Sequence, residues 1–171
     1  FVKSTCALVH NGIIENYEEI KKQLKLNNKN IDSDTDTEVI AEAFNKFIQR
    51  DNNIIKNIIN ISKKIKGTYS FAFLVKENNS IYGTRKGSPL VLGIGDKFNA
   101  ISSDVLGLPN STKEIIFLEE NDIFEISSDN FIILNSKGKK VTRPSHPFIS
   151  KKDFNTKGEF AHFMQKEIFH Q

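Results

Sequence analysis

Length, composition and charge describe one globular domain and exclude several classes of protein. The chain has 171 residues, of which 38% are hydrophobic and 26% charged, enough to build a single core and too apolar for a disordered tail. Lys and Arg number 24 against 21 Asp and Glu, and this net charge of +3 is spread without a basic stripe, so no nucleic-acid partner is expected. With one cysteine and no apolar run near the ~18 residues of a membrane span, we expect a cytoplasmic protein without a disulfide framework or membrane partner.

The first predicted elements are a buried strand and a short helix. Residues 5–9 are mostly apolar, as in a short buried strand, and Asn11-Gly12 then favours a turn because both residues tolerate unusual backbone angles. From Asn16 onward, Tyr17, Ile20 and Leu24 recur at helical spacing.

Two further helices are expected before the pattern changes. Residues 35–38 match a capping box, which places Asp36 in the first turn of a helix whose apolar stripe is Ile40, Ala43, Phe44 and Phe47. A third helix carries the stripe Ile54, Ile58, Ile61 and Ile65, and Gly67 is suited to end it with a left-handed cap.

After Gly67 the periodicity becomes that of strands. The expected strands are 68–75, 80–85, 90–94, 98–102, 115–118, 123–127, 131–134 and 139–142. Many are too close together for crossover helices, so their pairing should be mainly antiparallel. Residues 144–158 mix proline, serine and charge like a linker, and a short final helix follows. We therefore divide the chain into a domain at 1–143 and a linker with a helix at 144–171.

Six sequence blocks together resemble one family. The string LVHNGIIENY (8–17) resembles the glutaminase domain of the glutamine:fructose-6-phosphate aminotransferases, also called glucosamine-6-phosphate synthases. The other blocks occur in the same order as in that family: SDTDTEVI (33–40), RKGSPLV (85–91), SD (103–104), FLEEND (117–122) and HFMQKEI (162–168).

The resemblance implies an α+β fold, the later part of an N-terminal-nucleophile-hydrolase αββα sandwich. Members of this class II amidotransferase family begin with a catalytic cysteine, followed by an arginine-containing substrate loop, and continue into sugar-isomerase domains. Neither of the first two features is present and the chain stops near the last, so we expect a fragment cut at both ends and inactive alone.

Asn11 and Gly12 are the candidate catalytic residues. By resemblance, the Asn11 amide and the Gly12 N–H form an oxyanion hole, which lowers the barrier to thiolate attack on the glutamine carboxamide. The alternative is that Asn11-Gly12 is only a turn.

Asp36 is the candidate substrate-binding residue. By resemblance, its carboxylate accepts the α-ammonium group of glutamine through charge-assisted hydrogen bonds. The alternative is an acid that only complements the helix dipole, a role that Asp34 or Glu38 would fill equally well.

Three other features are expected to be structural. His10 adjoins the site but fits a hydrogen-bonded residue at a strand end, so we assign it no proton transfer. Residues 85–89 lack the spacing of a phosphate-binding loop, and Cys6 fits a buried inert thiol. The four histidines lack the close Cys or His neighbours of a zinc motif, so no metal is expected.

For the intact protein, the resemblance implies hydrolysis of glutamine through a cysteinyl thioester, with ammonia passed to fructose 6-phosphate to make glucosamine 6-phosphate. It implies no cofactor. Expected partners are glutamine, the missing N-terminal segment and the C-terminal sugar-isomerase domains, in a homodimer. Two alternatives stay open: a noncatalytic glutamine-binding module, and another class II amidotransferase such as amidophosphoribosyltransferase.

Overall fold

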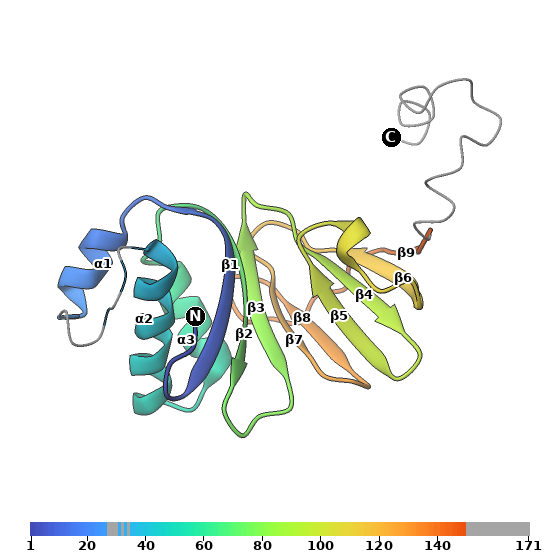
Figure 1. Ribbon diagram of the computed structural model, residues 1–171. Coiled ribbons are helices and arrows are strands. Elements are labelled where there is room, and N and C mark those ends of the chain that lie inside the picture. The colour runs from blue at the N-terminus through green and yellow to red at the C-terminus, as the bar shows by residue number, and fades with distance from the viewer. Residues whose placement is uncertain (27–30, 32, 34, 150–171) are drawn as a thin grey trace.

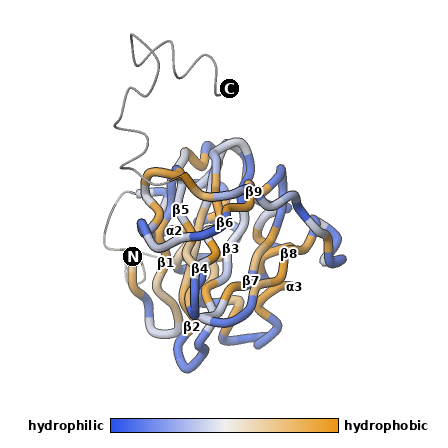
Figure 2. The backbone as a smooth tube through the Cα atoms, turned by 90° about the vertical axis from the view of Figure 1, so that its right-hand side faces the viewer, coloured by the Kyte–Doolittle hydropathy of each residue, from blue (hydrophilic) through white to orange (hydrophobic). Residues whose placement is uncertain are grey.

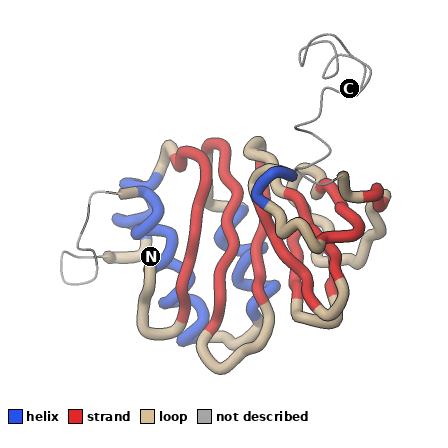
Figure 3. The backbone as a smooth tube through the Cα atoms, turned by 45° about the vertical axis from the view of Figure 1, so that its right-hand side comes forward, coloured by secondary structure: helices blue, strands red, loops and turns tan. Residues whose placement is uncertain are grey.

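The computed structural model describes residues 1–26, 31, 33 and 35–149, which form three stacked layers (Figure 1). Helices make the first layer, a five-stranded sheet (sheet A) the second, and a four-stranded sheet (sheet B) the third. Figure 3 shows the longer helices gathered on one side of the strands. The described strand pairs are antiparallel, which confirms the predicted α+β class and pairing.

Sheet A has β1 at one edge. Its strand order is β1-β2-β3-β7-β8, formed by Cys6–Ile14, Gly67–Val75, Ile81–Lys86, Ile123–Ile126 and Phe131–Leu134. The β1–β2 register is unbroken and places Asn11 opposite Ser70 and Gly12 opposite Tyr69. Because β1 pairs with a sheet neighbour on one side only, its other edge carries backbone groups that point away from the sheet.

Sheet B packs on the face of sheet A opposite the helices. Its order is β5-β4-β6-β9, formed by Phe98–Ser102, Val91–Gly95, Thr112–Phe117 and Ser145–Pro147. Buried residues of both sheets, including Ala72 and Phe124 of sheet A and Leu92 and Ile116 of sheet B, share one apolar cluster. Figure 2 shows hydrophobic colour along the strands and hydrophilic colour at many of the turns between them. Within the described residues, a short 3-10 helix (Val105–Gly107) lies against the outer face of sheet B.

The helical layer covers sheet A through the predicted apolar stripes. Its members are α1 (Tyr17–Gln23), α2 (Asp36–Arg50) and α3 (Ile54–Ser62). Phe44 of α2 is fully buried, and its ring lies 5.4 Å from that of Phe71 and 4.5 Å from that of Phe73, measured between centroids. These aromatic contacts fix α2 against β2.

Several predicted boundaries differ from the structure. The third helix ends at Ser62, and Gly67, with φ +114°, begins β2 and does not cap the helix. Residues 139–142 form no strand, only an isolated bridge at Lys140. β9, which pairs with β6, lies in the segment expected to be a linker. Residues 150–171, which contain the rest of that linker and the predicted final helix with HFMQKEI, lie outside the described residues, so the division at 143/144 stays a prediction.

A buried ion pair ties the end of the described chain to the domain. Arg143 donates two hydrogen bonds to Asp122, from Nε to Oδ2 at 2.9 Å and from Nη2 to Oδ1 at 2.7 Å. The Asp122 side chain is only 1% exposed, and hydrogen bonding to it is the main cause that raises the pKa of Arg143. The Glu119 N–H also donates to Asp122 Oδ2 at 2.8 Å, and Arg143 supplies the positive charge beside the buried carboxylate.

We predict that Arg143→Met lowers the free energy of unfolding by about 3 kcal/mol, because it leaves a buried carboxylate without its cation. Urea denaturation of both proteins measures this change. The control is Lys113→Met, which breaks an ion pair with Asp96 whose side chains are 63% and 77% exposed and should cost less than about 1 kcal/mol. Equal losses in the two variants would contradict the prediction.

Candidate functional site

Asn11 and Gly12 lie inside β1, so the prediction of a turn at this dipeptide is wrong. β1 continues through Gly12 to Ile14 and pairs with β2 along its whole length. Gly12 has φ +131°, and a Cβ atom there would overlap the carbonyl oxygen of Thr68. Glycine is needed here because the neighbouring backbone comes close and the φ angle is one that side chains disfavour.

The Gly12 N–H points to the free edge of β1. On a strand, the N–H groups of alternate residues point to the same edge. The N–H of Leu8 donates to the Phe1 carbonyl oxygen and that of Ile14 to the Asp36 carboxylate, so both face away from β2. Gly12 lies between them in the same alternation, so its N–H faces the same way.

Asp36 lies against this edge, two residues along from Gly12. Its Oδ2 accepts the Ile14 N–H at 2.9 Å, and its side chain is 22% exposed. The predicted cap positions it, because Thr35 accepts the Glu38 N–H at the start of α2. The structure thus brings Asp36 and the Gly12 backbone to one edge. Successive strand residues rise about 3.3 Å, so the Gly12 and Ile14 nitrogens are roughly 7 Å apart, a separation that one glutamine molecule spans.

The other acids near this helix end are placed differently. Glu38 is buried, and its carboxylate binds Lys3 Nζ at 2.7 Å and the Ser33 hydroxyl at 2.6 Å. Asp34 lies outside the described residues. Glu38 therefore stabilises the helix start, whereas Asp36 alone among the described acids of this turn contacts β1.

The Asn11 side chain faces a small cavity between the sheets. Asn11 and Ser70 are opposite each other in the ladder, so their side chains share a face. Both line a cavity of about 210 Å³ together with Ser102 and Ser103, and Asp36 and Gly12 do not line it. Within the described residues, the buried Ser70 hydroxyl has no hydrogen-bond partner. The Asn11 side chain and the Gly12 N–H therefore face different spaces, although the two residues are adjacent on β1.

His10 links β1 to the first turn of α2. Its side chain is 2% exposed, and Nδ1 lies 3.0 Å from Thr37 Oγ1 and 3.8 Å from Asp36 Oδ1. Burial lowers the pKa of His10, and the nearby Asp36 charge opposes this shift. The expectation that His10 is hydrogen-bonded is confirmed. Thr37, which the sequence marked only as part of a cap, is its partner.

Cys6 and residues 85–89 are structural, as expected. Cys6 is buried on the helix side of sheet A, and burial raises the pKa of its thiol to about 11, so it is protonated at neutral pH. Arg85 donates to the Leu118 carbonyl oxygen at 2.8 Å and to the Glu120 carboxylate at 2.9 Å, which holds its loop against the end of β6.

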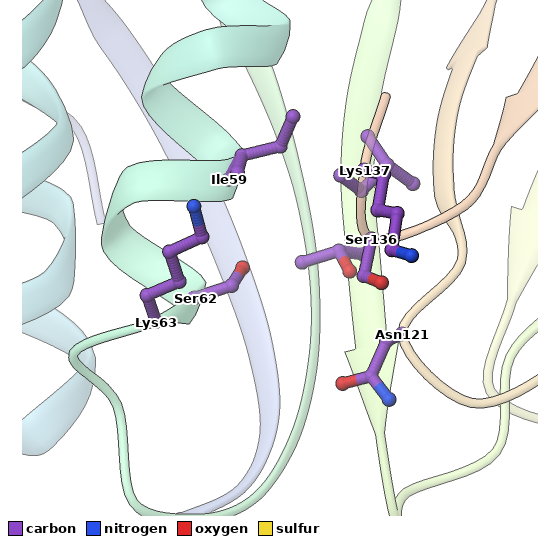
Figure 4. A pocket seen from close by; sticks show the side chains of 8 residues that line it. Ile59, Ser62, Lys63, Asn121, Ser136 and Lys137 are labelled. Carbon is purple, nitrogen blue, oxygen red and sulfur yellow. The ribbon is translucent and has the colours of Figure 1, made fainter. Parts of the chain in front are cut away.

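A second cavity lies away from these residues. It has a volume of about 660 Å³ and is bounded by α3, β3 and the turn before residue 138, with Ser62, Lys63, Asn121 and Lys137 on its walls (Figure 4). Asn11, Gly12 and Asp36 do not line this cavity.

Among the described residues, the helices are all too short or too polar to span a membrane. The same part of the chain contains no group of three His, Cys, Asp or Glu side chains that could hold a metal ion.

Comparisons of sequence agree with one another. Residues 1–108 match the family described as the glutamine amidotransferase domain. The chain is 40% identical over 170 residues to the glutamine–fructose-6-phosphate aminotransferase (isomerizing) of Fusobacterium nucleatum, and 39% identical over 172 residues to that of Aquifex aeolicus. These alignments cover 96% and 99% of this chain but only 27% and 28% of the relatives.

Comparisons of structure confirm the fold. The glutamine phosphoribosylpyrophosphate amidotransferase of B. subtilis, solved with ADP and GMP, superposes with a TM-score of 0.64 at 19% identity, covering 80% of this chain and 30% of that one. A structure described as the allosteric regulatory enzyme of purine biosynthesis gives 0.50 at 22% identity, covering 87% and 30%. The predicted sandwich of N-terminal-nucleophile type is therefore confirmed; the described residues supply both sheets and one helical layer.

We predict that His10 makes stability depend on pH. Its pKa is lower in the folded chain than the ~6.5 of an unfolded histidine, so below pH ~6.5 the unfolded state binds more protons and the free energy of unfolding falls as pH falls. His10→Asn, which does not titrate, should lose less stability than the wild type between about pH 7.5 and about pH 5.5.

Urea denaturation at the two pH values measures the difference. His146→Asn is the matched control for replacing a histidine by asparagine, because His146 is exposed on β9. The prediction fails if His10→Asn and wild type lose the same free energy on acidification.

Proposed function

Because the chain belongs to the glutamine amidotransferase domain family, we propose that it binds glutamine along the free edge of β1 as part of a glutaminase site. The observation that carries this proposal is the hydrogen bond from the Ile14 N–H to Asp36 Oδ2, which puts the carboxylate beside the edge that the Gly12 N–H faces. The chain spans about 27% of the length of its curated relatives, so the activity of the whole protein is part of the proposal.

Gly12 and Asn11 supply the oxyanion donors. When a thiolate attacks the carboxamide carbon, the carboxamide oxygen becomes an anion, and fixed N–H donors stabilise it most where water is excluded. The β1–β2 ladder fixes the Gly12 backbone with its N–H towards the free edge, and the Asn11 side chain lies on the face of β1 that lines the small cavity. Cys6 is buried, and burial raises the pKa of its thiol, so we assign it no part in the attack.

Asp36 receives the α-ammonium group. A carboxylate accepts hydrogen bonds at about four positions, and the Ile14 N–H and the Thr37 hydroxyl take two of them. The remaining positions and the partial exposure of Asp36 leave room for an amine. Charge-assisted bonds of this kind select glutamine over an uncharged analogue.

The proposed whole-protein reaction is that of a glutamine–fructose-6-phosphate aminotransferase. Glutamine is hydrolysed through a cysteinyl thioester, and the ammonia passes to fructose 6-phosphate to form glucosamine 6-phosphate. Identity of about 40% over nearly the whole chain supports this choice over amidophosphoribosyltransferase, whose structural likeness at 19% identity concerns the fold alone. We further propose that the whole protein is a cytoplasmic homodimer containing sugar-isomerase domains.

Two substitutions in the whole protein test the roles separately. Asn11→Ala should lower kcat for glutamine hydrolysis about 100- to 1000-fold, because one oxyanion donor is lost. Asp36→Asn should raise KM for glutamine about tenfold or more, because a charge-assisted bond to the substrate is lost. Ammonia release and glucosamine 6-phosphate formation are the two assays.

The exposed Asn110→Ala is the control for truncating an asparagine and should leave both assays unchanged. A noncatalytic glutamine-binding module would bind glutamine without releasing ammonia. Formation of phosphoribosylamine in place of glucosamine 6-phosphate would favour the amidophosphoribosyltransferase reading. Wild-type kcat and KM in both variants would contradict the proposed site.

A further inference from the structure

A directed chain of hydrogen bonds joins His10 to Asp36 through Thr37. The Thr37 hydroxyl donates to Asp36 Oδ1 at 3.2 Å, and its one hydrogen is used in that bond. His10 Nδ1, 3.0 Å from the same hydroxyl oxygen, must therefore be the donor to it. The network assigns the neutral ring its Nδ1–H tautomer.

We propose that His10 and Thr37 are positioning residues that hold the Asp36 carboxylate in the orientation that receives the α-ammonium group of glutamine. This inference rests on the proposed function and deepens it, because neither side chain is assigned contact with the substrate. The proposal concerns the contact between Asp36 and the α-ammonium group, and specificity for an amino acid would follow from that contact.

The geometry accounts for both oxygens of Asp36. Oδ2 is held by the Ile14 N–H, and Oδ1 is held by Thr37, which is in turn held by His10. Two restraints on different oxygens fix the rotation of the carboxylate about its Cβ–Cγ bond, which one restraint cannot do. A carboxylate fixed before binding loses less freedom when the amine arrives.

The buried position of His10 supports the same role. The ring is 2% exposed, and its Nε2 is buried without a hydrogen-bond partner among the described residues. An unpaired buried nitrogen is costly, and an apolar residue would fill the space without that cost. Burial also lowers the pKa of His10, which favours the neutral ring that donates from Nδ1.

Matched variants separate positioning from packing. Thr37→Val keeps the shape of the side chain and removes the hydroxyl, whereas Thr37→Ser keeps the hydroxyl. His10→Phe keeps a ring and removes the donor, whereas His10→Asn keeps an amide N–H near the place of Nδ1. The first variant of each pair removes one hydrogen bond of the His10–Thr37–Asp36 network, and the second variant keeps that bond.

The first measurement is the affinity of the chain for glutamine and for glutaramate, which has the same carboxamide and carboxylate but no amine. Thr37→Val and His10→Phe should weaken glutamine binding about tenfold and leave glutaramate binding unchanged. Thr37→Ser and His10→Asn should retain most of the wild-type affinity for glutamine. A residue with only a structural role would change both affinities together.

The second measurement needs no ligand. Hydrogen exchange of the Ile14 amide reports its bond to Asp36, and it should be about tenfold faster in Thr37→Val than in wild type or Thr37→Ser. If the wild-type chain binds no glutamine, the proposed function fails, and Ile14 exchange still decides whether Thr37 and His10 position Asp36. Unchanged Ile14 exchange, or unchanged discrimination between the two ligands in a chain that binds glutamine, would overturn the inference.

Discussion

The candidate site depends on the hydrogen bond between the Ile14 N–H and the Asp36 carboxylate, because it joins the first turn of α2 to the free edge of β1. An edge strand presents N–H groups without strand partners, and here a helix side chain takes one of them and leaves the Gly12 N–H two residues away. The packing of Phe44 against Phe71 and Phe73 holds the body of the same helix on sheet A. Helix α2 therefore fixes both the hydrophobic core and the candidate site.

Local sequence patterns predicted those features of the fold that interactions within one helix determine. The Thr35 cap and the apolar stripe through Ile40 and Phe44 predicted the start and the buried face of α2, and both are observed. Cap geometry is set within one turn, and amphipathic spacing selects the face that packs. Because Asp36 follows the cap directly, its place in the first turn could be predicted from the sequence.

Long-range pairing explains what local patterns missed. Asn11-Gly12 has the composition of a turn, but β2, more than 50 residues later in the chain, pairs with it and draws it into a strand. Gly67 is likewise part of a strand. It begins β2, where a Cβ atom would overlap the Ile13 carbonyl oxygen. The bond between His10 and Thr37 likewise exists only after α2 packs on β1, so no spacing in the sequence indicates it.

An amide-resolved titration of the chain with glutamine tests the central claim most directly, since it asks where the ligand lies. The account predicts saturable shifts of the Gly12 and Ile14 amide signals, with little change at Asn121 and Lys137, which line the cavity of about 660 Å³. Saturable shifts around Asn121 and Lys137, with the Gly12 and Ile14 signals unmoved, would contradict it.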